Sequence, residues 1–404
     1  MKIALVVNSF PAVSETFLYN HAAGLRAHGL DVTVVAADPA NDAAMFADDA
    51  GRRFDGPVRA IVLARGPAQT LRELSRRLLA APARDLALWQ AARAHYGMTR
   101  RAVRAWLIAL ALAGFDLVHF EYSGLAVAYA DALPLVRPAR LVVSCRGTQE
   151  RIVPVVDAAR AARLRELFAI VDRVHCVSAD MLRTCVSYGL DPARAFVNHP
   201  AIDPRRFTRS SPYAARAAGP YRLISTGRLH WAKGLEFALL AVRDLVGRGV
   251  DVHYEIVGAG PERERLVFAI HDLGLAGRVT LSGRRTADQV RAALEAADVY
   301  VLSSVSEGVS NAALEAMAME LPVVTTDAGG MAEAIRDGVE GRVVPSRSPE
   351  ALAHAIAGLL ADPARRVTLG RAARRRIENE LSIERQIAVF VAEYEALVQG
   401  ARGT

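Results

Sequence analysis

Residues 298–327 read DVYVLSSVSEGVSNAALEAMAMELPVVTTD, and this stretch holds one strand–helix–strand pattern. An apolar run ending at Ser304 predicts a strand, Ser310 or Asn311 can cap a helix, and residues 322–327 form a second β-branched run. Six such runs in each half of the chain alternate with helical patterns. This alternation predicts right-handed βαβ units on parallel sheets, which is the doubly wound α/β class.

The chain length favours two domains. It has 404 residues, and a single hydrophobic core rarely exceeds about 250–300 residues. Residues 198–220 are rich in Pro, Ser and Arg and lack periodicity, so we expect the boundary there. We predict an N-terminal Rossmann-like domain over 1–203, a linker over 204–219 and a C-terminal Rossmann-like domain over 220–382. Because such sheets bind ligands at the carboxyl ends of their strands, two in tandem predict a deep interdomain cleft.

The composition narrows the class of protein. Hydrophobic residues make up 52% and charged residues 23%, as in soluble globular proteins. No apolar run approaches the roughly 20 residues of a membrane-spanning helix, and the start of the chain lacks the features of a signal peptide. The three cysteines have no metal-ligand spacing and indicate a reduced, cytoplasmic interior. The net charge of +7 suits phosphates, nucleic acids or anionic membranes without selecting one.

Two carboxylates lie in the loop and helix of the opening stretch. The helix start presents free N–H groups and a partial positive charge, which suits a phosphate. Glu315, eight positions after Glu307, can accept two hydrogen bonds from the diol of a ribose, while Glu307 would face sugar hydroxyls. Each glutamate alone could be an ordinary surface residue, but their combination with the polar cap and with residues 321–330 is more restrictive.

A lysine completes this predicted anion site. The chain contains 50 Lys and Arg, yet only Lys2 and Lys233 are lysines. This bias favours a site at Lys233 that needs a compact ammonium group, and a solvated surface lysine is the alternative. A leaving diphosphate needs cations on its oxygens, so Arg228 and Lys233 predict a diphosphate site. No metal-ligand pattern is visible, so we expect no metal and no cofactor.

Residues 256–266, IVGAGPERERL, match a dinucleotide-binding fingerprint only in part. Gly258 and Gly260 are present, but Arg263 stands at the third glycine position and Pro261 interrupts the pattern. A nicotinamide or flavin Rossmann enzyme is therefore disfavoured.

Four motifs taken together carry a family resemblance. In this order they resemble the family 4 retaining glycosyltransferases of GT-B fold, across about residues 221–345. The first loop and helix, residues 10–30, are similar to exopolysaccharide-type members. The four motifs are GRLHWAKG (227–234), VGAGPERERL (257–266), SEGVSNAALEAM (306–317) and LPVVTTDAGGMAEAI (321–335).

The resemblance implies roles for the matching residues. Arg228 and Lys233 would hold the diphosphate of a nucleoside diphosphate sugar, a UDP-sugar in preference to a GDP-sugar. Glu315 would bind its ribose, and Glu307 would lie beside the transferred sugar. A helix at about 383–400 would pack back on the N-terminal domain. The remaining donor-site residues would be Gly258, Gly283, Arg284, Gly308, Val309, Ser310 and Asn311, with the base near Gly283 and Arg284.

The N-terminal half departs from the family at one position. The family often has a His where this chain has Arg146. Arg146 would take over that catalytic role, or it would merely pair with a nearby acid such as Glu150. The resemblance places the acceptor in this half, and the candidate contacts are Ser14, Glu15, Thr16 and His119. Ser14 or Thr16 could instead cap the helix that follows.

The expected partners are a nucleotide-sugar donor and a saccharide or lipid-linked acceptor, with no nucleic acid. Residues 67–106 carry eight arginines among leucines and tryptophans. They predict peripheral contact with the inner face of an anionic membrane, or else a solvated helical face. Other nucleotide-sugar chemistry, such as that of an epimerase or a synthase, stays open, as does a nucleotide-sugar-binding protein without turnover.

Overall fold

The computed structural model describes residues 1–11, 16–38, 54–61 and 83–402. The chain divides into two compact units, and each is described by itself. Unit 1 comprises Met1–Cys176, Leu182–Val197 and Ile387–Thr404. Unit 2 comprises Val177–Met181 and Asn198–Gln386. The expected cleft between them stays a prediction.

Unit 1 is built on a seven-stranded parallel sheet with the order β3-β2-β1-β4-β5-β6-β7. The sequence predicted six of these strands, and β7 is the seventh. The strands are β1 (Lys2–Ser9), β2 (Asp31–Asp38), β3 (Val58–Ala60), β4 (Leu117–Phe120), β5 (Arg140–Cys145), β6 (Arg173–Cys176) and β7 (Ala195–Val197). The doubly wound prediction is confirmed for this unit.

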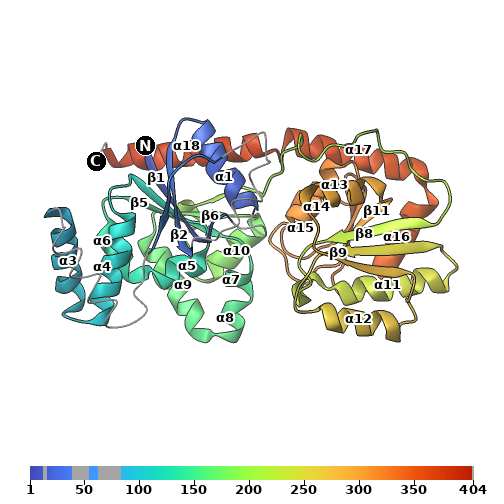
Figure 1. Ribbon diagram of the computed structural model, residues 1–404, viewed down its shortest axis with the longest axis horizontal. Coiled ribbons are helices and arrows are strands. Elements are labelled where there is room, and N and C mark those ends of the chain that lie inside the picture. The colour runs from blue at the N-terminus through green and yellow to red at the C-terminus, as the bar shows by residue number, and fades with distance from the viewer. Residues whose placement is uncertain (12–15, 39–53, 62–82, 403–404) are drawn as a thin grey trace. The chain divides into compact units, whose positions relative to one another are not determined.

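Helices flank this sheet in Figure 1. The apolar run near residue 105 forms the inner face of α4, where Trp106 and Ile108 are fully buried. The helices are α1 (Thr16–Ala27), α3 (Ala83–Tyr96), α4 (Arg100–Leu112), α5 (Ser123–Ala128), α6 (Leu133–Val136), α7 (Thr148–Arg151), α8 (Val153–Val156) and α9 (Ala158–Ile170). Two further helices, α10 (Ala179–Ser187) and α18 (Ile383–Arg402), begin in unit 2 and continue into unit 1.

Unit 2 has a six-stranded parallel sheet with the order β10-β9-β8-β11-β12-β13. All six predicted strands are present. They are β8 (Tyr221–Thr226), β9 (Val252–Val257), β10 (Val279–Gly283), β11 (Val299–Leu302), β12 (Val323–Thr326) and β13 (Gly341–Val344). The opening stretch of the sequence therefore forms β11, the helix α14 (Asn311–Ala318) and β12.

Alternate strand residues of unit 2 enter two separate cores, as expected for a sheet covered on both faces. Leu223 of β8 packs in one core and the adjacent Ile224 in the other. In Figure 1, α11 (Leu235–Gly247) and α12 (Arg263–Asp272) lie on one side of the sheet, and α13 (Ala287–Ala296) and α14 lie on the other. The short elements are η5 (Trp231–Lys233), a 3-10 helix, and α15 (Met331–Ala334).

Residues 204–219 contain no helix or strand and run along unit 2. Arg209 donates to the carbonyls of Glu295 and Met319, and the Tyr213 hydroxyl donates to the carbonyl of Asp298. The C-terminal end forms α16 (Pro349–Ala361), α17 (Pro363–Asn379) and α18, the last of which matches the helix expected at about 383–400. Within the described ranges, no helix combines the length and apolarity needed to span a membrane.

Candidate functional site

The predicted cations of unit 2 line one pocket at the carboxyl ends of its strands. Arg228 follows β8, and Lys233 ends η5 just before α11. Both side chains contribute to the pocket, as the sequence predicted for a shared anion site. Its lining consists of Ser225, Thr226, Gly227, Arg228, Lys233, Leu235, Ile256, Val301, Leu302 and Ser303.

A glycine brings Lys233 against the loop after β11. Gly234 has a φ of 54°, and a Cβ there would lie 2.3 Å from the carbonyl oxygen of Ser303. A side chain at this position is therefore excluded on both conformational and steric grounds. The close approach lets Lys233 reach Glu307, with 2.8 Å between Nζ and Oε2. The Ser304 hydroxyl donates to the same Oε2 at 3.0 Å, a partner that the sequence analysis missed.

The loop that carries Glu307 is fixed by its main chain. The Gly330 N–H donates to the Gly308 carbonyl at 2.7 Å. A Cβ at Gly329 would lie 1.8 Å from the Glu307 carbonyl oxygen. The Ala-Gly-Gly segment of the fourth motif therefore serves to let a neighbouring loop pack against Glu307 and Gly308.

The helix after this loop starts as predicted. Ser310 is the N-cap of α14, and its hydroxyl accepts from the Ala313 N–H. Val309 and Ser310 are buried. The buried Asn311 Oδ1 has no hydrogen-bond partner among the described residues. An acceptor left open at a helix start is available to a bound ligand.

Glu315 lies on α14, half-buried, and its carboxyl group makes no hydrogen bond or ion pair with any residue that the structure describes. Burial raises the pKa of Glu315 to about 7, although Arg206 acts in the opposite direction. A carboxyl group without partners inside a protein is unfavourable. This position fits a group that waits for donors from a ligand.

The remaining donor-site predictions concern the loops after β9 and β10. Gly258 has a φ of 149°, and a Cβ there would lie 1.8 Å from the Gly227 carbonyl oxygen. Its N–H donates to the Gly283 carbonyl at 2.8 Å. Arg228 and Arg284 are exposed, and neither makes an ion pair with the described residues. These loops are therefore tied together by backbone contacts, with two cationic side chains left free.

In unit 1, the acceptor predictions have different outcomes. Ser14 and Glu15 lie outside the described residues, and Thr16 is the half-buried first residue of α1. His119 is fully buried in β4. Its Nδ1 is 2.5 Å from the Tyr394 hydroxyl, and its Nε2 is 2.8 Å from Ser144 Oγ. The structure therefore places His119 in the interior of unit 1.

Arg146 pairs with a carboxylate that the sequence analysis did not name. It follows β5, and its Nε donates to the Glu121 carbonyl at 2.9 Å while its terminal nitrogen contacts Glu121 Oε2. The guanidinium also lies 4.6 Å from the centre of the Phe17 ring. Glu150, the acid considered from the sequence, instead accepts from the Ser123 hydroxyl and the Gly147 N–H.

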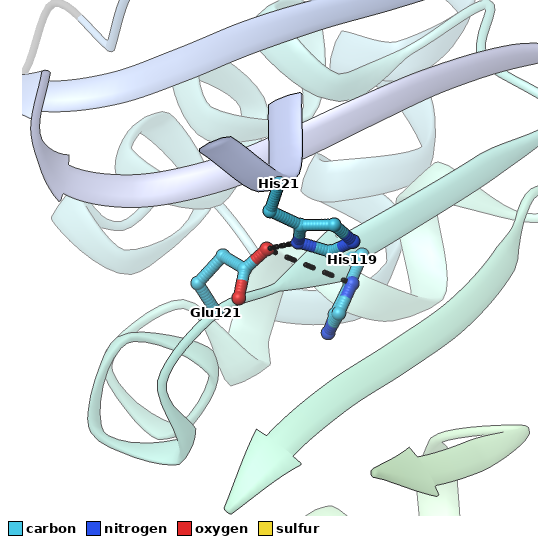
Figure 2. Close-up of side chains that lie close together, drawn as sticks. All are labelled: His21, His119 and Glu121. Carbon is cyan, nitrogen blue, oxygen red and sulfur yellow. Dashed lines mark hydrogen bonds and ion pairs between the residues drawn. The ribbon is translucent and has the colours of Figure 1, made fainter. Parts of the chain in front are cut away.

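Figure 2 shows Glu121 with two histidines. His21 Nδ1 is 2.6 Å from Glu121 Oε1, and His119 Nδ1 is 3.9 Å from the same oxygen. Although burial alone would raise it, His21, His119 and Arg146 hold the pKa of Glu121 well below its usual range. Burial lowers the pKa of His119 to about 3, so this imidazole is neutral. We call His21, His119, Glu121, Arg146 and Tyr394 the Glu121 network.

The two histidines and Glu121 are also residue types that bind metals, and their ligand atoms lie within 4.8 Å of one another. Two ligands of a tetrahedral zinc stand roughly 3.3 Å apart, given bonds of about 2.0–2.2 Å. The 2.6 Å between His21 Nδ1 and Glu121 Oε1 is instead a hydrogen-bond distance. Because both nitrogens of His119 are also hydrogen-bonded, the geometry is that of a buried polar network.

Two family models match the chain. The model for glycosyl transferases group 1 matches residues 210–376, and the model for glycosyltransferase family 4 matches residues 14–206. The first match covers the Lys233, Glu307 and Glu315 site. The second covers every residue of the Glu121 network except Tyr394.

Individual proteins agree with these matches. A Salmonella typhimurium protein named as a colanic acid biosynthesis glycosyltransferase is 28% identical, over 88% of this chain and 90% of its own length. The D-inositol 3-phosphate glycosyltransferase of Pseudarthrobacter chlorophenolicus is 33% identical, over 70% of this chain and 71% of its own. The crystal structure of Anabaena HepE in complex with UDP is 20% identical, with a TM-score of 0.73, over 97% of this chain and 100% of that one.

Proposed function

This chain belongs to glycosyltransferase family 4 and has the GT-B fold, and from that premise we propose which reaction it catalyses. It transfers a sugar from a nucleoside diphosphate sugar to a hydroxyl group, with retention at the anomeric carbon. The donor is a UDP-sugar in preference to a GDP-sugar. The acceptor is a saccharide, a glycolipid or another small molecule with a free hydroxyl.

One observation carries this proposal. Lys233 and Glu307 form an ion pair at the carboxyl edge of the unit 2 sheet, and Glu315 on the next helix has no partner among the described residues. A nucleoside diphosphate sugar presents a ribose diol, a diphosphate and the hydroxyls of the transferred sugar, in this order. Lys233 fits the diphosphate, Glu315 the diol and Glu307 the sugar, so each group meets complementary chemistry.

The chemistry proposed at this site needs no covalent intermediate. The bond between the anomeric carbon and the diphosphate oxygen breaks, and the acceptor oxygen bonds to the same face of that carbon. The acceptor proton passes to an oxygen of the leaving diphosphate. Arg228 and Lys233 stabilise the charge that grows on the diphosphate, where fixed cations act most strongly. They fill the role that a metal ion has in other transferases.

Arg146 is proposed as the cationic hydrogen-bond donor on the unit 1 side. It stands at the carboxyl end of β5, and its side chain is 16% exposed. One edge of the guanidinium is bound to Glu121, which leaves other N–H groups for a ligand oxygen.

Relatives support the choice of donor and acceptor classes. Crystals of Anabaena HepE contain UDP in one case and UDP-glucose in another. The similar proteins named for colanic acid and amylovoran biosynthesis are exopolysaccharide glycosyltransferases by name. These names favour a UDP-sugar donor and a saccharide acceptor for this chain.

Calorimetry and product analysis test the proposal. We expect UDP to bind and GDP to bind at least tenfold more weakly. A panel of UDP-sugars should then show slow hydrolysis without an acceptor and sugar transfer when a saccharide acceptor is added. Formation of an epimerised nucleotide sugar would indicate a different reaction, and UDP binding without turnover of any sugar would indicate a binding protein.

Contact with a membrane is a second part of the proposal. Residues 67–82 lie outside the described part, but α3 and the turn after it expose Leu86 and Met98, the latter 77% exposed. Arg84, Arg93 and Arg100 are exposed beside them. We expect flotation with anionic vesicles that is lost at high salt. No flotation, or equal flotation with neutral vesicles, would make these arginines an ordinary solvated face.

A further inference from the structure

Glu121 is a buried carboxylate with an unusual set of contacts. It follows β4, and its side chain is 1% exposed. Oε1 accepts from His21 of α1, and Oε2 pairs with Arg146. The main-chain carbonyl of the same residue accepts from Arg146 Nε. One residue therefore supplies two separate acceptors to one guanidinium.

These contacts fix the direction of the Arg146 side chain. A free arginine has many rotamers, but Glu121 binds two of its nitrogens and Phe17 lies against its planar face. His21 in turn holds the second oxygen of Glu121, as Figure 2 shows. A guanidinium that is held along one edge and on one face can donate hydrogen bonds only from its remaining N–H groups.

A purely structural role explains this arrangement less well. A buried ion pair adds little net stability, because apolar side chains of the same volume stabilise a core equally well or better. The pair also stands at the carboxyl edge of the sheet, where ligands bind in doubly wound folds. Glu150, a second buried carboxylate of this unit, bonds Ser123, Gly147 and the main-chain N–H of Arg146, and not the Arg146 side chain. Burial of an acid in this unit therefore does not by itself require a bond to the Arg146 guanidinium.

We propose that Glu121 is a positioning residue for the transfer reaction, and that it fixes the direction in which the Arg146 guanidinium donates. This inference rests on the function proposed above. Glu121 does not touch the substrate, and its effect on the reaction passes through the Arg146 guanidinium.

The test compares four variants with the wild-type chain. Glu121→Gln keeps the shape and removes the charge, and Arg146→Gln removes the guanidinium. The double variant combines both changes. Glu150→Gln is the control, since it changes a second buried carboxyl group of the same unit, which contacts the Arg146 main chain but not its guanidinium. The readouts are kcat with the UDP-sugar that the wild type uses best, the dissociation constant of UDP, and a melting curve.

The expected pattern separates positioning from folding. Glu121→Gln should lower kcat by about 10²-fold through misplacement of Arg146, and Glu150→Gln should change it less than threefold. The double variant should be no slower than Arg146→Gln alone. UDP, which lacks the transferred sugar, should bind to all variants with an affinity within about twofold of that of the wild type. Independent, multiplying effects of the two changes, or an equal loss in the control, would overturn the proposal.

A crystal structure of Glu121→Gln gives a readout that does not depend on the donor. We expect the Arg146 guanidinium to leave the face of Phe17. An unmoved Arg146 would overturn the positioning role, even if the reaction proves different. If Glu121→Gln fails to fold, Glu121→Asp provides the same comparison, with a smaller shift of Arg146 expected. Failure of the wild-type protein to bind UDP would instead contradict the proposed function.

Discussion

The two sheets end in polar clusters of opposite character. At the carboxyl edge of unit 2, the side chains of Glu315 and Arg228 have no hydrogen-bond or ion-pair partner among the described residues, and the Lys233 side chain has only Glu307. In unit 1, the side chains of the Glu121 network bond mainly to one another, although the buried His21 Nε2 has no hydrogen-bond partner among the described residues. Polar groups kept without partners usually wait for a ligand, whereas satisfied networks fix the direction of a few side chains. The difference supports the proposals that unit 2 binds the donor and that unit 1 orients Arg146.

The largest effect that would sharpen this contrast is expected at Lys233. Lys233→Ala should lower kcat by at least about 10³-fold, because it removes a cation from the leaving diphosphate. Lys233→Arg should still cost about 10²-fold, since a planar fork beside Gly234 displaces the diphosphate. Steady-state kinetics measure both changes, with melting curves to confirm folding. Wild-type kcat in the folded arginine variant would mean that any basic residue serves there.

Glu315 comes next. Glu315→Ala should weaken UDP binding by one or two hydrogen bonds to a charged group, each worth about 1.5–3 kcal/mol. Calorimetry with UDP measures the loss, and Glu333→Ala, which removes a carboxylate elsewhere in the same unit, is a control. Unchanged UDP affinity in a folded Glu315→Ala protein would contradict the proposed contact with the ribose and leave Glu315 without an assigned role.

The carboxyl group of Glu315 should also affect the stability of the ligand-free protein. Its replacement should weaken UDP binding but stabilise the fold. Its pKa is raised from 4.5 to about 7, so the folded state holds a proton that the unfolded chain releases above pH 4.5. The free energy of unfolding therefore falls as pH rises from about 4.5 to about 7. We expect Glu315→Gln to stabilise the protein by about 1–3 kcal/mol at pH 8 and by little at pH 5.

Urea unfolding at the two pH values measures this difference. A variant that is equally stable to the wild type at pH 8 would mean that Glu315 is already compensated in the ligand-free protein. The contrast between an open site in unit 2 and a largely hydrogen-bonded network in unit 1 would then lose its main support.

The smallest expected effect concerns metal removal. Arg228 and Lys233 are proposed to neutralise the diphosphate, so activity with a UDP-sugar should survive excess EDTA within about twofold. Metal analysis of the purified protein should also find none bound by His21, His119 and Glu121, whose contacts are hydrogen bonds. Activity lost in EDTA and restored by Mg²⁺ or Mn²⁺ would contradict the cation assignment.

Local patterns in the sequence predict much of the fold and the unit 2 site. Twelve apolar runs mark twelve of the strands in the described residues, and the one strand not predicted is β7, which has three residues. The cap at Ser310 and the contact between Lys233 and Glu307 follow from motifs in which a strand end, a loop and a helix start are adjacent. Such features need only the common geometry of one sheet edge.

The Glu121 network is different, because its partners are far apart in the sequence. Glu150 is four residues from Arg146, whereas the actual partner, Glu121, lies 25 residues earlier, directly after the neighbouring strand β4. His21 is 100 residues from Glu121, and Tyr394 is 275 residues from His119. No local period or spacing links such residues. The signal that could have drawn attention to Glu121 is an acid at the end of a strand otherwise made of apolar residues and one histidine.

The hydrogen bond between His119 and Tyr394 also determines when unit 1 can be completed during translation. Ribosomes add about 5–20 residues per second, so the 275 residues between these partners take roughly 14–55 s to translate. During that interval β4 and its neighbours can form, but His119 lacks the hydroxyl that fills its Nδ1 in the finished protein. The first unit to be synthesised is thus completed only after the second has emerged. A nascent chain arrested before residue 394 should therefore be a preferred substrate for chaperones and proteases.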